Sequence, residues 1–158
     1  ASLNINLGNK PISALNGIYT VHGYLTNPHF FIGAGIGYEI EYHDDYAEAL
    51  IKNIPLFINT RYYILNSKTT PFISLSLGKN NVLNKSDEGR LYDLKGKLFF
   101  GCGIGLKSYL KNKNAILYEF NFKYSMYDFS YPNSIDLNTI NSYDADIPIF
   151  NFTIGYSF

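Results

Sequence analysis

The chain ends in Phe150-Asn-Phe-Thr-Ile-Gly-Tyr-Ser-Phe158, a stretch in which a large apolar residue takes every second position. Successive side chains of an extended strand point to opposite faces. The stretch therefore predicts a β-strand with one wholly apolar face and one small or polar face. A soluble protein must cover such an apolar face with another layer. A closed barrel in a bilayer needs no such layer, because lipid contacts the apolar side, so the pattern favours a transmembrane β-barrel.

The same alternation of apolar with polar or small residues recurs along most of the chain. It is clear at 30–43, 54–65, 72–80, 97–109 and 116–127, and it is weaker at 3–7 and 19–25. Together with the terminal stretch, these segments predict eight strands. In the clearest of them, the alternation places Ile36, Ile40, Phe100 and Ile104 on the lipid-facing side. No segment of useful length has the periodicity of an amphipathic helix, so the sequence predicts an all-β fold.

The links between the predicted strands alternate in length. Short links fall at 26–29, 66–70 and 111–114, and long links fall at 44–53, 84–94 and 131–146. Outer-membrane barrels have short periplasmic turns and longer extracellular loops. An even number of strands then places both chain ends in the periplasm and the three long links outside the cell. We therefore expect one domain over residues 1–158, an eight-stranded antiparallel up-and-down transmembrane β-barrel in the bacterial outer membrane.

Composition narrows the class of protein further. The 158 residues carry 13 basic and 13 acidic side chains, a balance that predicts no nucleic-acid partner. Aromatic residues reach 17%, which suits the ring girdles of a membrane barrel. The single cysteine, Cys102, excludes an intramolecular disulfide and a cysteine-based zinc site. We expect no metal or other cofactor. No signal peptide is visible at Ala1, as expected if it has been removed or if the chain was shortened to exclude it.

The polar faces of the predicted strands carry charges that must pair, because an eight-stranded barrel is only wide enough for its interior to fill with side chains. The expected lumen charges are Glu39, Glu41, Arg61, Lys97, Lys107, Glu119 and Lys123. A hairpin closed at 111–114 would place Lys107 opposite Glu119. Arg61, on the strand after Glu39 and Glu41, is expected to neutralise them. We interpret the set as a structural salt-bridge network that plugs the barrel.

Some polar residues allow a second interpretation. Glu39 and Glu41 share one face and could instead bind a cation or share a proton. His22 is expected to lie in the lumen as a hydrogen-bonded residue rather than a ligand. Short acidic clusters at 44–45 and 144–146 could bind Ca²⁺, although such clusters are usually only solvated.

The longest predicted outer loop, 131–146, is the expected site of contact with a partner. A loop on a rigid scaffold can carry recognition, whereas strand faces against lipid cannot vary freely. The candidate contact residues are Tyr131, Ile135, Asp136, Leu137, Ile140, Tyr143, Asp144 and Asp146. We hypothesise an extracellular protein or glycan partner. The alternative is a passive loop that caps the barrel rim.

Taken together, the chain resembles the small outer-membrane barrels grouped as OmpA-like, OmpX-like and opacity-like proteins. The terminal aromatic strand carries this resemblance, as does the glycine pattern at Gly33, Gly35 and Gly37. The resemblance extends over the whole chain and implies a Gram-negative outer-membrane protein, expected to be a monomer, with a structural or adhesion-type role. It implies no single activity.

Two other classes are less consistent with the sequence. Some eight-stranded barrels modify lipid A as deacylases or acyltransferases, and the deacylases use a His-x-Ser pair. Here Tyr24, Phe31 and Asp45 stand two residues after the three histidines, so the motif is missing and an enzyme is not expected. A soluble ligand-binding barrel needs an apolar lumen and a polar exterior, the inverse of this pattern.

Overall fold

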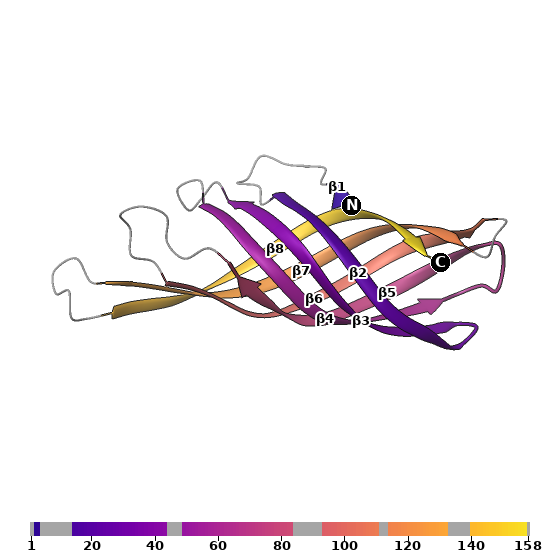
Figure 1. Ribbon diagram of the computed structural model, residues 1–158, viewed down its shortest axis with the longest axis horizontal. Helices are drawn as coiled ribbons and strands as arrows, with labels where there is room; N and C mark the ends of the chain where they lie inside the picture. Colours follow the sequence, from indigo (N-terminus) through magenta and orange to yellow (C-terminus); the bar gives the residue numbers. More distant parts are fainter. Residues whose placement is uncertain are drawn as a thin grey trace.

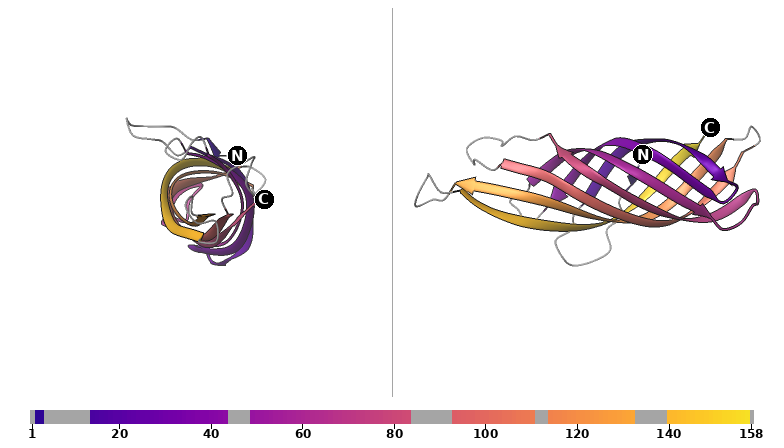
Figure 2. Two further views of the ribbon diagram at one scale, coloured as in Figure 1. Left: turned by 90° about the vertical axis from the view of Figure 1, so that its left-hand side faces the viewer. Right: turned by 90° about the horizontal axis from the view of Figure 1, so that it is seen from below.

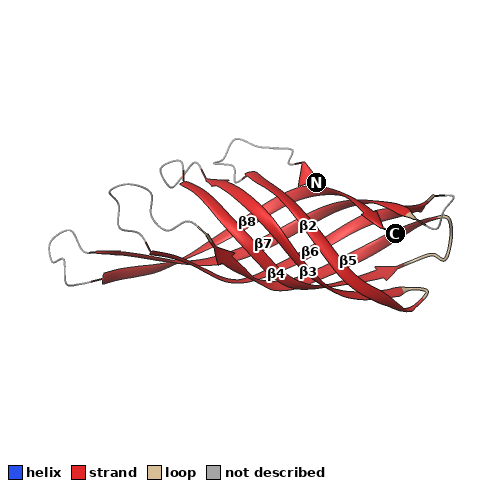
Figure 3. Ribbon diagram, viewed as in Figure 1, coloured by secondary structure: helices blue, strands red, loops and turns tan. Residues whose placement is uncertain are grey.

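The computed structural model describes residues 2–3, 14–43, 49–83, 93–110, 114–132 and 140–157, and within them it contains strands and short connections but no helix long and apolar enough to cross a membrane. Figure 1 and Figure 3 show the strands, which run diagonally around a common long axis. Their bounds are β1 Ser2–Leu3, β2 Ala14–Asn27, β3 Phe30–His43, β4 Ala49–Tyr63, β5 Thr69–Val82, β6 Asp93–Tyr109, β7 Ala115–Pro132 and β8 Ile140–Ser157.

The strands form one antiparallel up-and-down sheet in the order β1-β8-β7-β6-β5-β4-β3-β2. Each of the seven long strands pairs with its neighbour in sequence, while the two-residue β1 pairs with β8 through Ser2–Thr153 and Leu3–Phe152. The sheet curls around its axis, as the end-on view of Figure 2 shows, and β1 lies next to β2. The predicted all-β, antiparallel, up-and-down arrangement is confirmed.

The strand limits agree with the sequence pattern only where the alternation is unbroken. The strand predicted at 30–43 has those limits in the structure. By contrast, β8 begins at Ile140, and its ladder with β7 starts at the Pro132–Ile140 pair. The predicted loop at 131–146 is therefore mostly strand. Within β8 the apolar residues Ile147 and Ile149 stand at odd positions, whereas Phe150 and Phe152 stand at even ones. The first half of the strand therefore does not continue the alternation of the terminal stretch, and the sequence pattern does not predict it.

The two faces of the curled sheet differ in polarity. The outward face carries large apolar side chains, each between 43% and 65% exposed, at Ile36, Leu56, Ile58, Ile73, Leu75, Leu77, Phe100, Ile104, Phe120, Phe150 and Ile154. We call these residues the apolar belt. The inward face carries buried polar side chains, which include Glu39, Asn59, Ser74 and Lys123. The predicted outward positions of Ile36, Phe100 and Ile104 are confirmed, and Ile40 is half-buried.

Two apolar clusters lie inside the sheet, one on each side of the polar interior. The first contains Leu15, Ile51, Tyr127, Ala145, Ile147 and Ile149, with Val82 and Leu94 packed against it. The second contains Tyr63, Phe72 and Leu117, with Phe31 against it. On β4 the inward residues thus run from apolar Ile51 through polar Asn59 to apolar Tyr63. The interior is a polar layer between two apolar ones.

The polarity of the two faces is exchanged at the end of the molecule where β7 and β8 extend farthest, which we call the projecting end (Figure 1, Figure 2). Here Tyr127 and Ala145 are buried inside, while the alternate residues Asp144 and Asp146 are exposed outside. The outer face is therefore charged at this end, whereas it is apolar along the belt.

Glycines on the inward face make room for aromatic rings. A Cβ atom added to Gly35 would lie 2.4 Å from the ring of Phe57, and one added to Gly37 would lie 2.5 Å from the ring of Tyr19. Both distances are far below van der Waals contact, so a larger residue would displace these rings. The glycine-rich stretch of β3 therefore creates space in a narrow interior, as its sequence predicts.

Candidate functional site

Two buried glutamates and one lysine form the centre of the polar interior. Glu39 and Glu41 lie two residues apart on the inward face of β3, with exposed fractions of 1% and 0%. The Lys123 ammonium donates to Glu39 Oε2 at 2.5 Å and to Glu41 Oε1 at 3.5 Å. Since β7 and β3 are not neighbours in the sheet, these bonds cross the interior of the curled sheet. Buried charges are costly unless paired, and the lysine pairs with both carboxylates.

Two tyrosines complete the hydrogen bonds of the carboxylates. The Tyr19 hydroxyl donates to Glu39 Oε1 at 2.7 Å, and the Tyr127 hydroxyl donates to Glu41 Oε2 at 2.8 Å. The Tyr127 oxygen in turn accepts from the side-chain amides of Asn53, at 2.7 Å, and Asn80, at 3.1 Å. The donors thus run from amide to phenol to carboxylate, and the network links β2, β3, β4, β5 and β7.

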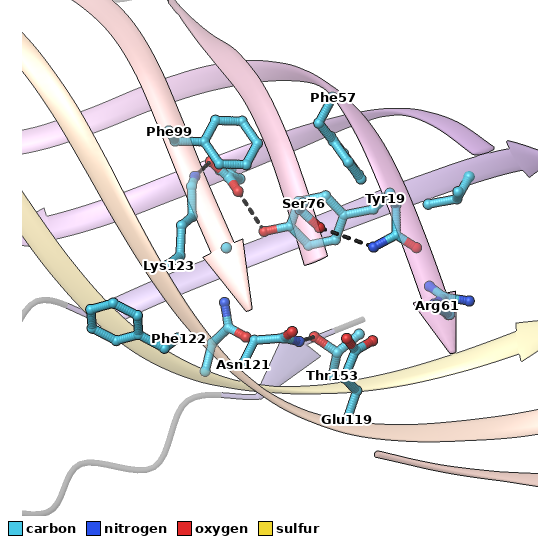
Figure 4. A pocket seen from close by; sticks show the side chains of 15 residues that line it. Tyr19, Phe57, Arg61, Ser76, Phe99, Glu119, Asn121, Phe122, Lys123 and Thr153 are labelled. Atoms are coloured by element: carbon cyan, nitrogen blue, oxygen red, sulfur yellow. Dashed lines mark hydrogen bonds and ion pairs between the residues drawn. The ribbon is translucent and has the colours of Figure 1, made fainter. Parts of the chain in front are cut away.

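Figure 4 shows Lys123 beside the Phe99 ring. The Lys123 ammonium lies 4.5 Å from the Phe99 ring centroid. It also donates to Asn80 Oδ1 at 3.4 Å. A lysine held by two carboxylates, an amide and a ring has little freedom to move. We call Glu39, Glu41 and Lys123 the lumen triad. Tyr19 and Tyr127 are the tyrosines that donate to it.

Arg61 does not neutralise the glutamates, so that prediction is wrong. In the β3–β4 ladder Arg61 pairs with Phe31, whereas Glu39 pairs with Asn53. Since a strand rises about 3.3 Å per residue, Arg61 lies roughly 26 Å along β4 from Asn53. Its guanidinium lies instead over the rings of Phe31, at 5.5 Å, and Phe72, at 5.7 Å.

The predicted Lys107–Glu119 pair is also wrong, by two residues of register. Lys107 pairs with Leu117, and Glu119 pairs with Gly105. Both charges are buried on the inward face, but no ion pair joins them in the part of the chain that the structure describes. Glu119 accepts a hydrogen bond from the Ser74 hydroxyl. The Lys107 ammonium lies 4.9 Å from the Tyr63 ring centroid and 4.7 Å from that of Tyr109.

Lys97 was expected in the lumen and instead points outward, where it forms ion pairs with Asp144 and, at 3.9 Å, with Asp128. The cause is a β-bulge in β6, where Lys97 and Leu98 together lie opposite the single residue Met126. A bulge of this kind interrupts the alternation, so both side chains take the same side. The Lys97 side chain is 41% exposed.

His22 is likewise exposed on the outward face, contrary to the prediction. On β2 the inward residues are Tyr19 and Val21, which line the interior cavity, and His22 takes the alternate side. Its Nε2 lies 3.0 Å from the Thr20 hydroxyl, also outside.

Some of the predicted partner-contact residues lie in strands, and others lie outside the described residues. Tyr131, Ile140 and Tyr143 belong to β7 and β8, while Asp144 and Asp146 are exposed on the outer face of β8. The remaining contact candidates, Ile135, Asp136 and Leu137, lie outside the described residues. The predicted acidic cluster at 44–45 also lies outside them. Much of the predicted loop at 131–146 is therefore part of the β7–β8 hairpin, which extends farther than the other strands (Figure 1).

A cavity of about 110 Å³ lies in the polar interior (Figure 4). Glu39, Arg61, Glu119 and Lys123 line it, together with asparagine, serine and threonine side chains and with apolar side chains that include Phe57, Phe99 and Phe122. Within the described residues, the Asn59 Oδ1, Arg61 Nε and Asn151 Oδ1 atoms are buried without a hydrogen-bond partner. A cavity of this size that exposes these polar atoms has room for several water molecules, which would satisfy them.

The tyrosines and asparagines of the network were missed in the sequence. The alternation at 19–25 is weak and does not mark Tyr19 as an inward residue, and Asn53 falls in the predicted link at 44–53. A buried amide or phenol gives no periodic signal of its own, because both residue types also occur on surfaces. No protein-family model and no curated protein matches the chain.

Proposed function

We propose that the protein is an integral outer-membrane β-barrel of eight strands, closed by β1 between β8 and β2. One observation carries this proposal, the apolar belt on the outside of a curled sheet whose inside is polar. Exposed apolar area of this extent is unfavourable in water and favourable in lipid. The enclosed backbone hydrogen bonds satisfy the demand that a bilayer makes on any segment crossing it.

On the outer face, apolar residues are replaced by charged ones toward the projecting end, and this change supports one membrane boundary there. On the outer face, the belt residues Phe120 and Phe150 give way to the charged residues Asp128 and Asp144. Charged side chains against hydrocarbon are costly, by about 2–4 kcal/mol for a cation at the bilayer centre. The bilayer edge therefore falls between the belt residues Phe120 and Phe150 and the charged residues Asp128 and Asp144. The projecting end is extracellular, and the connections at 28–29 and 64–68 are periplasmic turns.

The lumen acts as a plug in this proposal rather than as a channel. The lumen triad crosses the interior, and the two apolar clusters lie on either side of it. An eight-stranded barrel leaves an interior that side chains fill. The interior network thus stabilises the wall, and any further role belongs to the surface outside the membrane.

That role is a structural or adhesion-type one, carried by the projecting hairpin of β7 and β8. The hairpin rises beyond the belt, is fixed by a continuous ladder, and exposes Asp144 and Asp146 outward. A rigid, polar surface above a membrane suits contact with an extracellular protein or glycan.

Reconstitution tests the proposal. The protein is unfolded in urea and diluted either into lipid vesicles or into buffer without lipid or detergent. We expect a folded, protease-resistant form in vesicles, with cleavage limited to one end, and aggregation in buffer. A stable monomer in buffer without lipid would contradict the membrane location. Binding of the inserted protein to whole cells, with and without charge reversal at Asp144 and Asp146, tests the surface role.

A further inference from the structure

Three of the residues that line the interior cavity each present a buried polar atom without a hydrogen-bond partner among the described residues. Two of these atoms are acceptors, Asn59 Oδ1 on β4 and Asn151 Oδ1 on β8, and their side chains are buried. The third is a donor, the Nε–H group of Arg61 on β4. Since β7, β6 and β5 separate β8 from β4 in the sheet order, Asn59 and Asn151 stand on opposite walls of the cavity.

Glu119 and Asn121 bring more acceptor oxygens to the same space, and Figure 4 shows both with Arg61 around it. Glu119 accepts a hydrogen bond from the Ser74 hydroxyl, and Asn121 donates its amide to Thr153 Oγ1 at 3.4 Å. A carboxylate accepts up to about four hydrogen bonds and an amide oxygen about two. A molecule that fits this wall must therefore donate several hydrogen bonds and accept at least the one from Arg61.

The charges that line the cavity cancel. Among the described lining residues, Glu39 and Glu119 are acidic, and Arg61 and Lys123 are basic. An ion placed between them would add an unbalanced buried charge, which is costly, whereas a neutral molecule would not. The charge balance thus favours a neutral ligand.

The size and shape of the cavity limit the ligand further. Its volume is about 110 Å³. Because a cavity of about 150 Å³ admits a ring of six carbon atoms, this one has room for roughly four heavy atoms. Phe57 and Phe99 are among the lining residues, and the flat face of a planar molecule packs well on aromatic rings.

We propose that the cavity binds a small neutral amide of the urea class. Its N–H groups donate to Asn59 Oδ1 and Asn151 Oδ1, and its carbonyl accepts from the Nε–H of Arg61. Separate water molecules satisfy these atoms one at a time, whereas one rigid ligand joins β4 to β8 and so strengthens the plug. The site lies inside the curled sheet, so it goes beyond the proposed membrane location and does not depend on it.

Nuclear magnetic resonance of the side-chain amides tests the site. The full chain, labelled with ¹⁵N and folded in detergent micelles, is titrated with urea while the amide signals of Asn59 and Asn151 are followed. We expect saturable shifts with a dissociation constant of roughly 1 mM, within the limit for a ligand of this size and far below the molar levels at which urea denatures proteins. Guanidinium and acetate are controls of matched shape. Neither should saturate, because guanidinium is charged and has no acceptor, and acetate is charged and has no donor.

Two substitutions remove single contacts with the ligand. Arg61→Lys keeps the positive charge and removes the Nε–H group, and Asn151→Leu removes one acceptor. Each should weaken urea binding roughly two- to tenfold, the factor for the net contribution of one hydrogen bond. Asn66→Leu, at an exposed turn position, is the matched control and should leave the affinity unchanged.

The outcomes separate this site from the membrane location. Equal saturation by urea, guanidinium and acetate would overturn the assignment, because the cavity would then select volume alone. Unchanged affinity in both Arg61→Lys and Asn151→Leu would overturn it as well, and so would the absence of any saturable shift, which would leave only water in the cavity. If the chain proves to fold in buffer without lipid, the proposed function fails, and the same titration in buffer still decides the urea site.

Discussion

Lys123 on β7 and Glu39 on β3 form a buried ion pair of 2.5 Å across the interior of the curled sheet, between strands that do not share a ladder. The same ammonium bonds to Glu41, so one cation holds two buried carboxylates. A curled sheet gains a cross-brace in this way, because the bond resists flattening of the wall.

Loss of the brace should destabilise the fold strongly. Lys123→Met leaves Glu39 and Glu41 buried without their shared cation, and breaking a buried pair costs about 3–5 kcal/mol. Urea unfolding in vesicles measures the change. Lys97→Met is the control, since that lysine is exposed and ion pairs at the surface contribute little to stability. Equal effects of the two substitutions would remove the distinction between inside and outside. Adding Glu39→Gln to Lys123→Met should recover part of the loss.

The hydroxyl of Tyr127 should contribute measurably. Tyr127→Phe removes the donor to Glu41 and the acceptor for Asn53 and Asn80, all of which are buried. Unsatisfied buried groups cost about 1–3 kcal/mol. The free energy of unfolding should fall by that amount, whereas Tyr24→Phe on the exposed face should change it little. No loss in Tyr127→Phe would mean that water replaces the hydroxyl.

Glycine at position 35 should be needed for packing. Gly35→Ala places a methyl group 2.4 Å from the Phe57 ring, and overpacking of this kind costs about 1–3 kcal/mol. Gly101→Ala is the matched control, because the nearest atom to its added Cβ lies 3.5 Å away. Replacing the ring as well, with Phe57→Leu, should restore part of the stability lost in Gly35→Ala. If both alanine variants unfold at the same urea concentration, the proposed space requirement is wrong.

A charge in the apolar belt should be costly, but a charge above it should not. Ile104→Arg puts a cation on the outward face at a position that is 65% exposed, and the penalty near the bilayer centre is about 2–4 kcal/mol. Ser142→Arg, exposed on the projecting part of β8, should have little effect. Unfolding in vesicles measures both, and a neutral Ile104→Arg would place that face in water.

The sequence alone predicts the fold class, the inside–outside pattern and the limits of β3, because alternation is a local property of a strand. It fails where a non-local feature decides the result. Lys97 was placed on the wrong side because a bulge adds a residue to β6. The partner of Arg61 was wrong because adjacent strands do not reveal their register. The contact of Lys123 with Glu39 depends on the curvature of the whole sheet, which no segment encodes by itself.

The central claim is that the apolar belt contacts lipid, and site-directed spin labelling measures this most directly. Labels are attached in vesicles to Ile104→Cys and to Asp144→Cys, each in a Cys102→Ser background. The account predicts that the label at 104 collides more with lipid-soluble oxygen than with an aqueous paramagnetic reagent. The label at 144 should show the reverse preference, because it lies beyond the bilayer edge. Free access of the aqueous reagent to both positions would contradict the account.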